Sequence, residues 1–517
     1  MSTDTGSPPA GPAAGPGAAD KLDRGVLKVA GVVVIGAIMS ILDVTVVSVA
    51  LPTLQREFDA NYATVAWTMT AYTLALAAVI PITGWAADRF GTRRLYLTSI
   101  VLFVAGSALC SLAWDIGPLI VFRALQGLGG GMLMPLGMTI MTRAAGPERV
   151  GRVMAVLGVP MLLGPIGGPI LGGWLIDAAS WQWIFLINVP IGAVALFAAW
   201  KVLPKDTAQP SEPFDVVGML LLSPGLALFL YGVSTIPEEG TVAAAKVLVP
   251  GLIGLVLVVA FVLHALRKAN ALIDLSLFKN RHVTIAVITM TLFSVAFMGA
   301  MLLFPSYFLQ VRMEDTLDAG LLLAPQGLGA MLTMPIGGRL TDKMGPGKLV
   351  LAGIVVISAG MGVFTQVGAD TSYFVLLSAL FVMGMGMGVT MMPIMSAALS
   401  TLTDHQIARG STMMNIVQQT AGSIGTAVMS VIFTNRVLDS TAAGAYSAVV
   451  QGKVPADQVP PTLLEQGRSA LAEAFGSTDT VALVLIVACL VPALFLPRRK
   501  SAATDGQAPG ASVAAMH

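Results

Sequence analysis

The stretch Gly84-Trp-Ala-Ala-Asp-Arg-Phe-Gly-Thr-Arg-Arg94 recurs, about 254 residues later, as Gly338-Arg-Leu-Thr-Asp-Lys-Met-Gly-Pro-Gly-Lys348. Both stretches follow an apolar segment and place a glycine, a carboxylate, a basic residue and a second glycine at the same spacing. The matching pairs are Gly84 and Gly338, Asp88 and Asp342, Arg89 and Lys343, Gly91 and Gly345, and Arg94 and Lys348. An internal repeat of this kind predicts a chain built from two related halves, an organisation typical of membrane transporters.

The composition is that of a membrane protein with many spans. Of the 517 residues, 56% are hydrophobic and 11% are charged, whereas a soluble chain carries about 25% charged residues. The net charge of +1 argues against a nucleic acid or an acidic macromolecule as partner. We therefore predict an all-α integral membrane fold with about fourteen transmembrane helices, at about 27–50, 64–87, 94–113, 118–141, 151–176, 183–203, 216–236, 244–266, 283–307, 318–340, 348–368, 373–397, 409–433 and 480–497.

The Lys and Arg residues predict the orientation of the chain. Most of the 29 fall in alternate connecting segments, starting with the N-terminal one, so the positive-inside rule places both termini in the cytoplasm. We expect a multi-pass protein of the cytoplasmic membrane, in contact with lipid. Its predicted parts are disordered tails at 1–25 and 498–517, six-helix bundles at 26–203 and 283–497, two linker helices at 204–282, and an outer loop at 434–479.

The most costly residue in the predicted spans is Arg123, which lies in the apolar stretch Ile120-Val-Phe-Arg-Ala-Leu-Gln-Gly127. An arginine in such a place costs roughly 2.5 to 3.5 kcal/mol on insertion scales and is normally paired. Asp43, in the first span, lies at a similar depth if both helices rise about 1.5 Å per residue. Because no other carboxylate lies as clearly inside a span, we predict that Asp43 and Arg123 form a buried ion pair.

This pair has two interpretations. It can be a permanent structural ion pair, or Asp43 can exchange a proton, because burial favours the neutral form of a carboxylate while a nearby cation favours the charged form. At the offsets of the repeat, the second half has Phe297 and Leu380 in these places. Maintenance of the fold alone predicts no such difference, so we expect proton chemistry in the N-terminal half.

Two glycine-rich segments are a second pair of similar stretches that supports the internal repeat. Gly127-Leu-Gly-Gly-Gly131 in the fourth predicted span resembles Gly384-Met-Gly-Met-Gly388 in the twelfth. Neither run joins a strand to a helix, as a dinucleotide-binding loop does. We interpret these glycines as packing residues in both halves.

The fifth predicted span is rich in glycine and proline, with the sequence Gly158-Val-Pro-Met-Leu-Leu-Gly-Pro-Ile-Gly-Gly-Pro-Ile-Leu-Gly-Gly173. Glycines at intervals of four residues give a helix a face without side chains, while prolines weaken its hydrogen-bond ladder. We predict a bendable helix that packs closely on a neighbour. Its candidate functional residues are Gly158, Gly164, Pro165, Gly168, Pro169 and Gly172.

The repeated loop segments are candidates for a gate on the cytoplasmic side. Asp88 could lie near Arg409 at the N-terminus of the thirteenth span, where the helix dipole favours a negative charge, and separate from it when the cytoplasmic side opens. The simpler interpretation is a turn that also acts as a topology signal. The candidate gating residues are Gly84, Asp88, Arg89, Gly91, Arg93, Asp342 and Lys343.

The second half carries its intramembrane polarity on amides and a phenol. Asn415, Gln418 and Gln419 share one helical face, a spacing that suits either a cavity lining or hydrogen bonds between helices. The 28 methionines suit adaptable apolar contact with varied ligands. The candidate residues of a substrate cavity are Tyr307, Gln310, Gln326, Asn415, Gln418 and Gln419.

Taken in order, these motifs resemble the major facilitator superfamily, and specifically its branch of fourteen-helix drug:proton antiporters. The loop at 84–94 is similar to the superfamily's signature after the second helix, although Thr92 stands where a basic residue is usual. The segment 123–127 resembles the helix-four motif tied to proton coupling, and 158–173 resembles the helix-five motif associated with antiporters. Two further stretches, 42–52 and 181–192, are similar to motifs of the fourteen-helix branch.

The resemblance implies the major facilitator fold, in which two six-helix bundles, here with two inserted helices, rock to give alternating access. It implies an efflux antiporter that exports lipophilic or cationic drugs in exchange for protons; the alternative is a dedicated exporter of an endogenous product, such as an antibiotic or a lipid. No nucleophile motif or P-loop occurs, which argues against an enzyme and against ATP-driven pumping. We expect a monomer with no cofactor and no metal.

Overall fold

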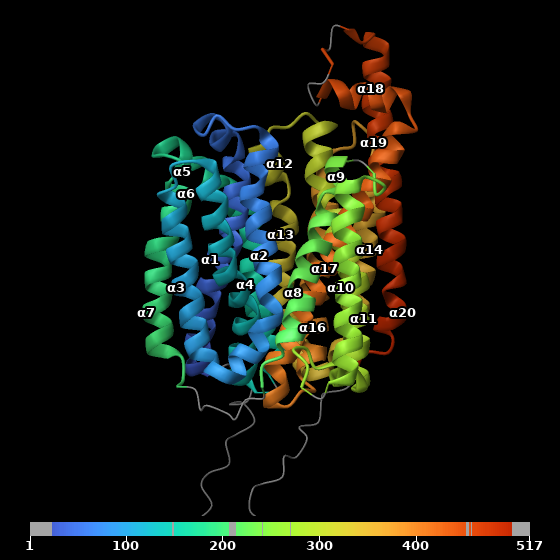
Figure 1. Ribbon diagram of the computed structural model, residues 1–517. Helices are drawn as coiled ribbons and strands as arrows, with labels where there is room; N and C mark the ends of the chain where they lie inside the picture. The colour runs from blue at the N-terminus through green and yellow to red at the C-terminus, as the bar shows by residue number, and fades with distance from the viewer. Residues whose placement is uncertain are drawn as a thin grey trace, which may run out of the picture.

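The computed structural model describes residues 23–498, except 147–148, 206–212, 240, 269, 451–453 and 456–457. The tails expected at 1–25 and 498–517 lie almost wholly outside these residues. The described part of the chain is a bundle of helices that run roughly along one direction (Figure 1). We call the end at which the first helix, α1 (Arg24–Glu57), begins the inner end, and the opposite end the outer end.

Each half of the chain supplies six spans. Those of the N-terminal half are α1, α2 (Tyr62–Phe90), α3 (Thr92–Ser111), α4 (Ile116–Ala145), α5 (Val150–Ala178), and α6 (Trp183–Leu186) joined to α7 (Asn188–Val202). Those of the C-terminal half are α11 (Arg281–Gln310), α12 (Thr316–Leu322) joined to α13 (Ala324–Met344), α14 (Pro346–Phe364), α15 (Tyr373–Gly388) joined to α16 (Met391–Leu399), α17 (Asp404–Leu438), and α19 (Pro461–Ala488) joined to α20 (Leu490–Ala493).

The number of spans agrees with the fourteen predicted. Thirteen helices in the described part of the chain are long and apolar enough to cross a membrane. The remaining predicted span is α5, a helix of 29 residues, several of whose side chains lie outside the described residues. The all-α membrane fold predicted from the composition is therefore confirmed.

The internal repeat extends to the packing of the helices. In the N-terminal half α1 packs on α5 and α2 packs on α4, and in the C-terminal half α11 packs on α17 and α13 packs on α15. The glycine runs are the contact points. A Cβ on Gly131 would lie 2.7 Å from the Leu76 carbonyl oxygen, and a Cβ on Gly388 would lie 2.7 Å from that of Ala330. These glycines are packing residues, because a side chain there would push the helices apart.

A helical pair lies between the two halves. It consists of α8 (Val216–Ser234) and α10 (Ala245–Arg267), joined through α9 (Ile236–Glu239) and followed by the 3-10 helix η3 (Leu275–Lys279). α8 packs on both α2 and α17, and the rings of Trp67 and Tyr231 stack with centroids 5.5 Å apart. At the inner end, the Asp215 carboxylate accepts hydrogen bonds from the Lys268 Nζ at 2.8 Å and from two backbone amides. The pair is thus fixed to both halves.

The outer segment 434–479 differs from the loop expected for it. α17 continues to Leu438, α18 (Thr441–Val450) packs on α19, and α19 already begins at Pro461. α18 and the beginning of α19 project beyond the rest of the bundle at the top of Figure 1. A Cβ on Gly467 of α19 would lie 2.5 Å from the Ala442 carbonyl oxygen of α18, so these two helices pack closely.

Candidate functional site

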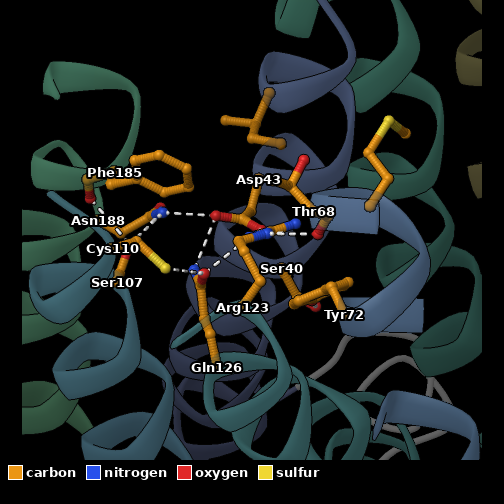
Figure 2. A network of polar contacts seen from close by, with 12 residues as sticks. Ser40, Asp43, Thr68, Tyr72, Ser107, Cys110, Arg123, Gln126, Phe185 and Asn188 are labelled. Atoms are coloured by element: carbon orange, nitrogen blue, oxygen red, sulfur yellow. Dashed lines mark hydrogen bonds and ion pairs between the residues drawn. The ribbon is translucent and has the colours of Figure 1, made fainter. Parts of the chain in front are cut away.

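Arg123 on α4 and Asp43 on α1 form a buried ion pair within the N-terminal half (Figure 2). Arg123 Nη1 donates to Asp43 Oδ2 at 2.5 Å, and the two residues are 0% and 2% exposed. Arg123 Nε also donates to the Thr68 carbonyl oxygen of α2 at 3.1 Å. The guanidinium therefore connects three helices, and the contact expected from the similar depth of the two charges is present.

Two amides that the sequence analysis did not single out complete this network. Gln126 Nε2 donates to Asp43 Oδ1 at 2.7 Å, while its Oε1 accepts from Arg123 at 2.7 Å. Asn188 Nδ2 donates to the same Asp43 oxygen at 3.0 Å. The signals were present, because Gln126 follows Arg123 by three residues on one helical face and Asn188 is an amide in an apolar span.

The network links protonation of Asp43 to the position of Arg123. The charged carboxylate accepts three donors and balances the guanidinium. A proton on Asp43 would remove the charge that holds Arg123 and would compete with one of these donors. Uptake of a proton by Asp43 would therefore require the pair to rearrange.

Tyr72 connects the network to a neighbouring cavity. The Arg123 guanidinium carbon lies 4.3 Å from the centroid of the Tyr72 ring. The Tyr72 hydroxyl shares a hydrogen bond of 3.1 Å with Ser40 Oγ. Ser40 in turn lines the cavity. A ligand that moves Ser40 would thus act on the ion pair through one intervening side chain.

The cavity has a volume of about 510 Å³ and lies between the two halves, within the range of sites for drug-sized ligands. The N-terminal half contributes residues of α1, α2 and α4, and the C-terminal half contributes residues of α11, α13, α15, α16 and α17. Four of the candidate cavity residues line it, namely Gln326, Asn415, Gln418 and Gln419.

Tyr307 and Gln310 do not line this cavity, in contrast to the assignment made from the sequence. Both lie at the outer end of α11. The buried Tyr307 hydroxyl donates to the Gly368 carbonyl oxygen at 2.7 Å, and its ring packs edge-on against Phe475. Depth and polarity suggested a cavity lining, but the rotation of α11 turns Tyr307 into the C-terminal half.

The repeated carboxylates both contact the opposite half at the inner end. Asp88 on α2 lies 3.7 Å from Arg409 of α17 and 3.6 Å from Arg143 of α4. Asp342 on α13 accepts from the Gly151 amide of α5 at 2.9 Å and lies 3.1 Å from Arg152 Nε. Each half thus presents the carboxylate of its second span to the fifth span of the other half. These contacts hold the two halves together at the inner end.

The other candidate gating residues have distinct positions. Gly91 and Gly345 end α2 and α13 with φ of +91° and +83°, a conformation that favours glycine. Gly84 lies against α17, where a Cβ would come 3.4 Å from Arg409 Cα. The Arg93 guanidinium donates to the Trp200 carbonyl oxygen, whereas Arg89 and Lys343 are exposed at the inner end.

The glycine face of α5 packs on two helices. At Gly164 and Gly168, a Cβ would overlap side chains of α1, Ile41 and Thr45, and at Gly172 it would come 3.2 Å from a backbone oxygen of α1. Nearer the inner end, a Cβ on Gly158 would lie 2.5 Å from Met334 of α13. α5 therefore contacts both halves closely. The side chains of Pro165 and Pro169 lie outside the described residues.

Asp479 is a further buried carboxylate that the sequence analysis did not single out. It lies inside α19 and is 1% exposed. Among the described residues, its Oδ1 has no hydrogen-bond partner. The sequence analysis missed it because α19 begins well before the span predicted at 480–497.

Comparisons with known proteins agree with this architecture. Residues 33–426 match the family described as Major Facilitator Superfamily. The chain is 49% identical over 499 residues to the Multidrug resistance protein B homolog of Mycobacterium tuberculosis strain ATCC 25618 / H37Rv, which covers 93% of this chain and 92% of the relative. It is 33% identical over 401 residues to the Multidrug export protein EmrB of Haemophilus influenzae, with 77% and 78% covered. The crystal structure of the human organic anion transporter MFSD10 (TETRAN) has a similar fold, with a TM-score of 0.61 at 15% identity over 89% of this chain and 99% of that chain.

Proposed function

Because the chain belongs to the major facilitator superfamily and is a transporter rather than an enzyme, we propose that it is a proton-coupled efflux antiporter. It exports lipophilic or cationic drugs across the cytoplasmic membrane by alternating access. Relatives named for multidrug resistance and multidrug export support the drug-efflux part of this proposal. The buried ion pair of the N-terminal half supports the proton-coupled part.

The main observation behind the proposal is that α1 contributes residues both to the ion-pair network and to the cavity. Asp43 on α1 belongs to the ion-pair network, and Ser40, Val44 and Thr45 of the same helix line the cavity. Substrate and proton therefore act on one helix from different sides. A change at either site can shift the population of conformations that the other site favours, which is the requirement for coupling.

The proton gradient supplies the energy in this scheme. The inner end is cytoplasmic, as the distribution of Lys and Arg predicts, with both termini on that side. Each proton that moves inward gains about 2.3 kcal/mol per 100 mV of membrane potential. This energy drives substrate outward when one protonation of Asp43 accompanies each transport cycle.

The gate of this scheme is the pair of carboxylate contacts at the inner end. The contact between Asp88 and Arg409 and the contact between Asp342 and Arg152 both join the two six-helix bundles. Both must break before a substrate can enter the cavity from the cytoplasm. The close glycine contacts of α5 with α1 and α13 provide surfaces along which the bundles shift.

The test is dye efflux from cells that express the wild type, Asp43→Asn or Asp479→Asn, with and without a protonophore. Uncharged Nile red and cationic ethidium serve as substrates. We expect the wild type to export at least one dye, the protonophore to stop export, and Asp43→Asn to abolish it. Asp479→Asn is the matched control, because it neutralises an equally buried carboxylate outside the network, and it should still export.

Two results would contradict the proposal in different ways. Efflux by Asp43→Asn at the wild-type rate, at equal expression, would make the ion pair purely structural. Export of neither dye by the wild type would favour a dedicated exporter of an endogenous product.

A further inference from the structure

The proposed function does not say whether the substrate is charged. The residues that line the cavity bear on this question. The lining residues that the structure describes are aliphatic side chains, methionines, glycines, hydroxyls and amides. Within this described lining there is no Asp, Glu, Lys, Arg or His, and no aromatic ring. Proteins hold organic cations with carboxylates or with the faces of aromatic rings, and this lining offers neither group.

Asp43 does not supply the missing negative charge. The cavity-lining residues of α1 are Ser40, Ile41, Val44 and Thr45, and at about 100° per residue Asp43 projects roughly 130° away from the centre of that face. Its two oxygens already accept hydrogen bonds from Arg123, Gln126 and Asn188. Together with Arg123, it forms a pair without net charge. Among the described lining residues, a ligand therefore meets no uncompensated carboxylate.

The chemistry of Gln326 indicates which kind of ligand the cavity binds. This α13 residue lines the cavity and is 5% exposed. Its amide nitrogen, Nε2, has no hydrogen-bond partner among the described residues. A buried donor without a partner is unfavourable, and a rotation of the amide toward the cavity would let an acceptor on a ligand satisfy it. The surrounding methionines, including Met298, Met301 and Met391, provide adaptable apolar contacts for the rest of such a ligand.

We propose that the cavity binds uncharged lipophilic molecules that carry a hydrogen-bond acceptor, such as a carbonyl group, in preference to cations of the same skeleton. Gln326 is the specificity-determining residue, and its amide nitrogen donates to this acceptor. Asn415 and Gln418, which line the cavity from α17, contact further polar groups of the substrate. The inference rests on the proposed function and narrows its substrate class from lipophilic or cationic to uncharged.

The test uses three molecules with one three-ring skeleton. N-methylacridone is uncharged and has a carbonyl acceptor, N-methylacridan is uncharged and lacks it, and N-methylacridinium is a permanent cation. Binding to the purified full-length protein in nanodiscs is measured by fluorescence titration of N-methylacridone and by its displacement by the other two. We expect N-methylacridone to bind about ten-fold more tightly than the cation, with N-methylacridan between them.

Two substitutions assign the preference to Gln326. Gln326→Leu should lower the affinity for N-methylacridone to that for N-methylacridan, and Gln326→Glu should raise the affinity for the cation. Gln466→Glu, the same change at an exposed position of α19, is the control and should leave all three affinities unchanged. If the Gln326 variants do not fold, the order of the three affinities in the wild type decides.

Binding of the cation as tightly as N-methylacridone, or no binding of N-methylacridone, would overturn the inference. Full preference for the carbonyl compound in folded Gln326→Leu would also overturn it. Transport in proteoliposomes separates this failure from that of the proposed function. If an imposed pH gradient drives export but the cation is preferred, only the inference fails. If N-methylacridone binds as expected but the gradient does not drive its transport, only the proton-coupled function fails.

Discussion

The two halves of the molecule share one scaffold but differ at its centre. Both use a glycine with positive φ after the second span, and both present a carboxylate to the opposite half. The N-terminal half buries the ion pair of Asp43 and Arg123, whereas the corresponding positions of the C-terminal half are Phe297 and Leu380, both fully buried. Phe297 stacks on Phe293 with ring centroids 5.2 Å apart.

This difference separates what the fold requires from what the ion pair adds. The C-terminal half packs its first, second, fourth and fifth spans in the same arrangement without a charge at these positions. The arginine of the N-terminal half costs roughly 2.5 to 3.5 kcal/mol to insert, a cost that the fold alone does not demand. The comparison therefore favours a functional role for the pair.

The largest expected effect comes from making the N-terminal half resemble the other half at one position. Arg123→Leu leaves Asp43 buried without its cation, which should reduce the free energy of unfolding by about 3 to 5 kcal/mol and abolish efflux. Thermal unfolding of the purified protein and dye efflux at equal expression measure the two effects.

The double substitution Asp43→Leu with Arg123→Leu is the matched control for this change. It removes both charges, so it should recover part of the lost stability while efflux stays absent. Normal efflux by the double variant would show that the ion pair serves stability alone, and the functional contrast between the halves would disappear.

The next largest effect is expected at the inner end, where the contacts of Asp342 and Asp88 should differ in strength. Asp342 accepts a backbone amide at 2.9 Å and lies 3.1 Å from Arg152, whereas Asp88 lies 3.6 and 3.7 Å from its two arginines. Asp342→Asn should therefore raise the population of molecules that are open at the inner end by about ten-fold. Asp88→Asn should raise it by only a few-fold. The labelling rate of a cysteine at the buried Ser411, with Cys110 and Cys489 replaced by alanine, measures the opening. Equal rates for the two variants would make the contacts equivalent.

Alanine substitutions at the glycine contacts of the two fifth spans should have a smaller effect, and the loss of stability should differ between the two spans. A Cβ on Gly425 of α17 would overlap the Val295 carbonyl oxygen of α11, whereas a Cβ on Gly172 of α5 would remain 3.2 Å from that of Val46. Gly425→Ala should cost about 1 to 3 kcal/mol, and Gly172→Ala should cost less. A comparison of their thermal unfolding midpoints measures this difference, and equal midpoints would contradict it.

The smallest effect on transport is expected at Asp215, between the halves. Burial raises the pKa of this carboxyl, but hydrogen bonds from Lys268, the Gly218 amide and His264 lower it to about 2 overall. Because the folded-state pKa is lowered, the stabilisation is present above the unfolded-state pKa of about 3.9 and is lost as the pH falls towards 2. Asp215→Asn should lower the unfolding midpoint equally at pH 5 and pH 7, and less at pH 3, with proton-driven efflux retained. A loss of efflux in a stable Asp215→Asn variant would show that the helical pair α8 and α10 takes part in proton coupling.

The sequence predicted contacts best where depth alone decides them. Asp43 and Arg123 were paired because two charges at one depth have few other partners in an apolar span. Asp88 was placed near Arg409 because the N-terminus of a helix favours a negative charge. The rotation of each helix about its own axis is set by neighbours that are distant in sequence. For this reason Gln126 and Asn188 were missed as partners of Asp43, and Tyr307 was assigned to a cavity that it does not line.

The sequence by itself determined the membrane fold, the positions of the spans and the division into two related halves, because hydrophobic length, glycine spacing and charge distribution are local properties. Only the tertiary structure decided which amides surround Asp43, which residues line the cavity, and that Asp479 is buried. These properties depend on which helix faces are brought together by packing between the halves. The uncharged lining of the cavity belongs to this second group, since it arises where residues of seven spans meet.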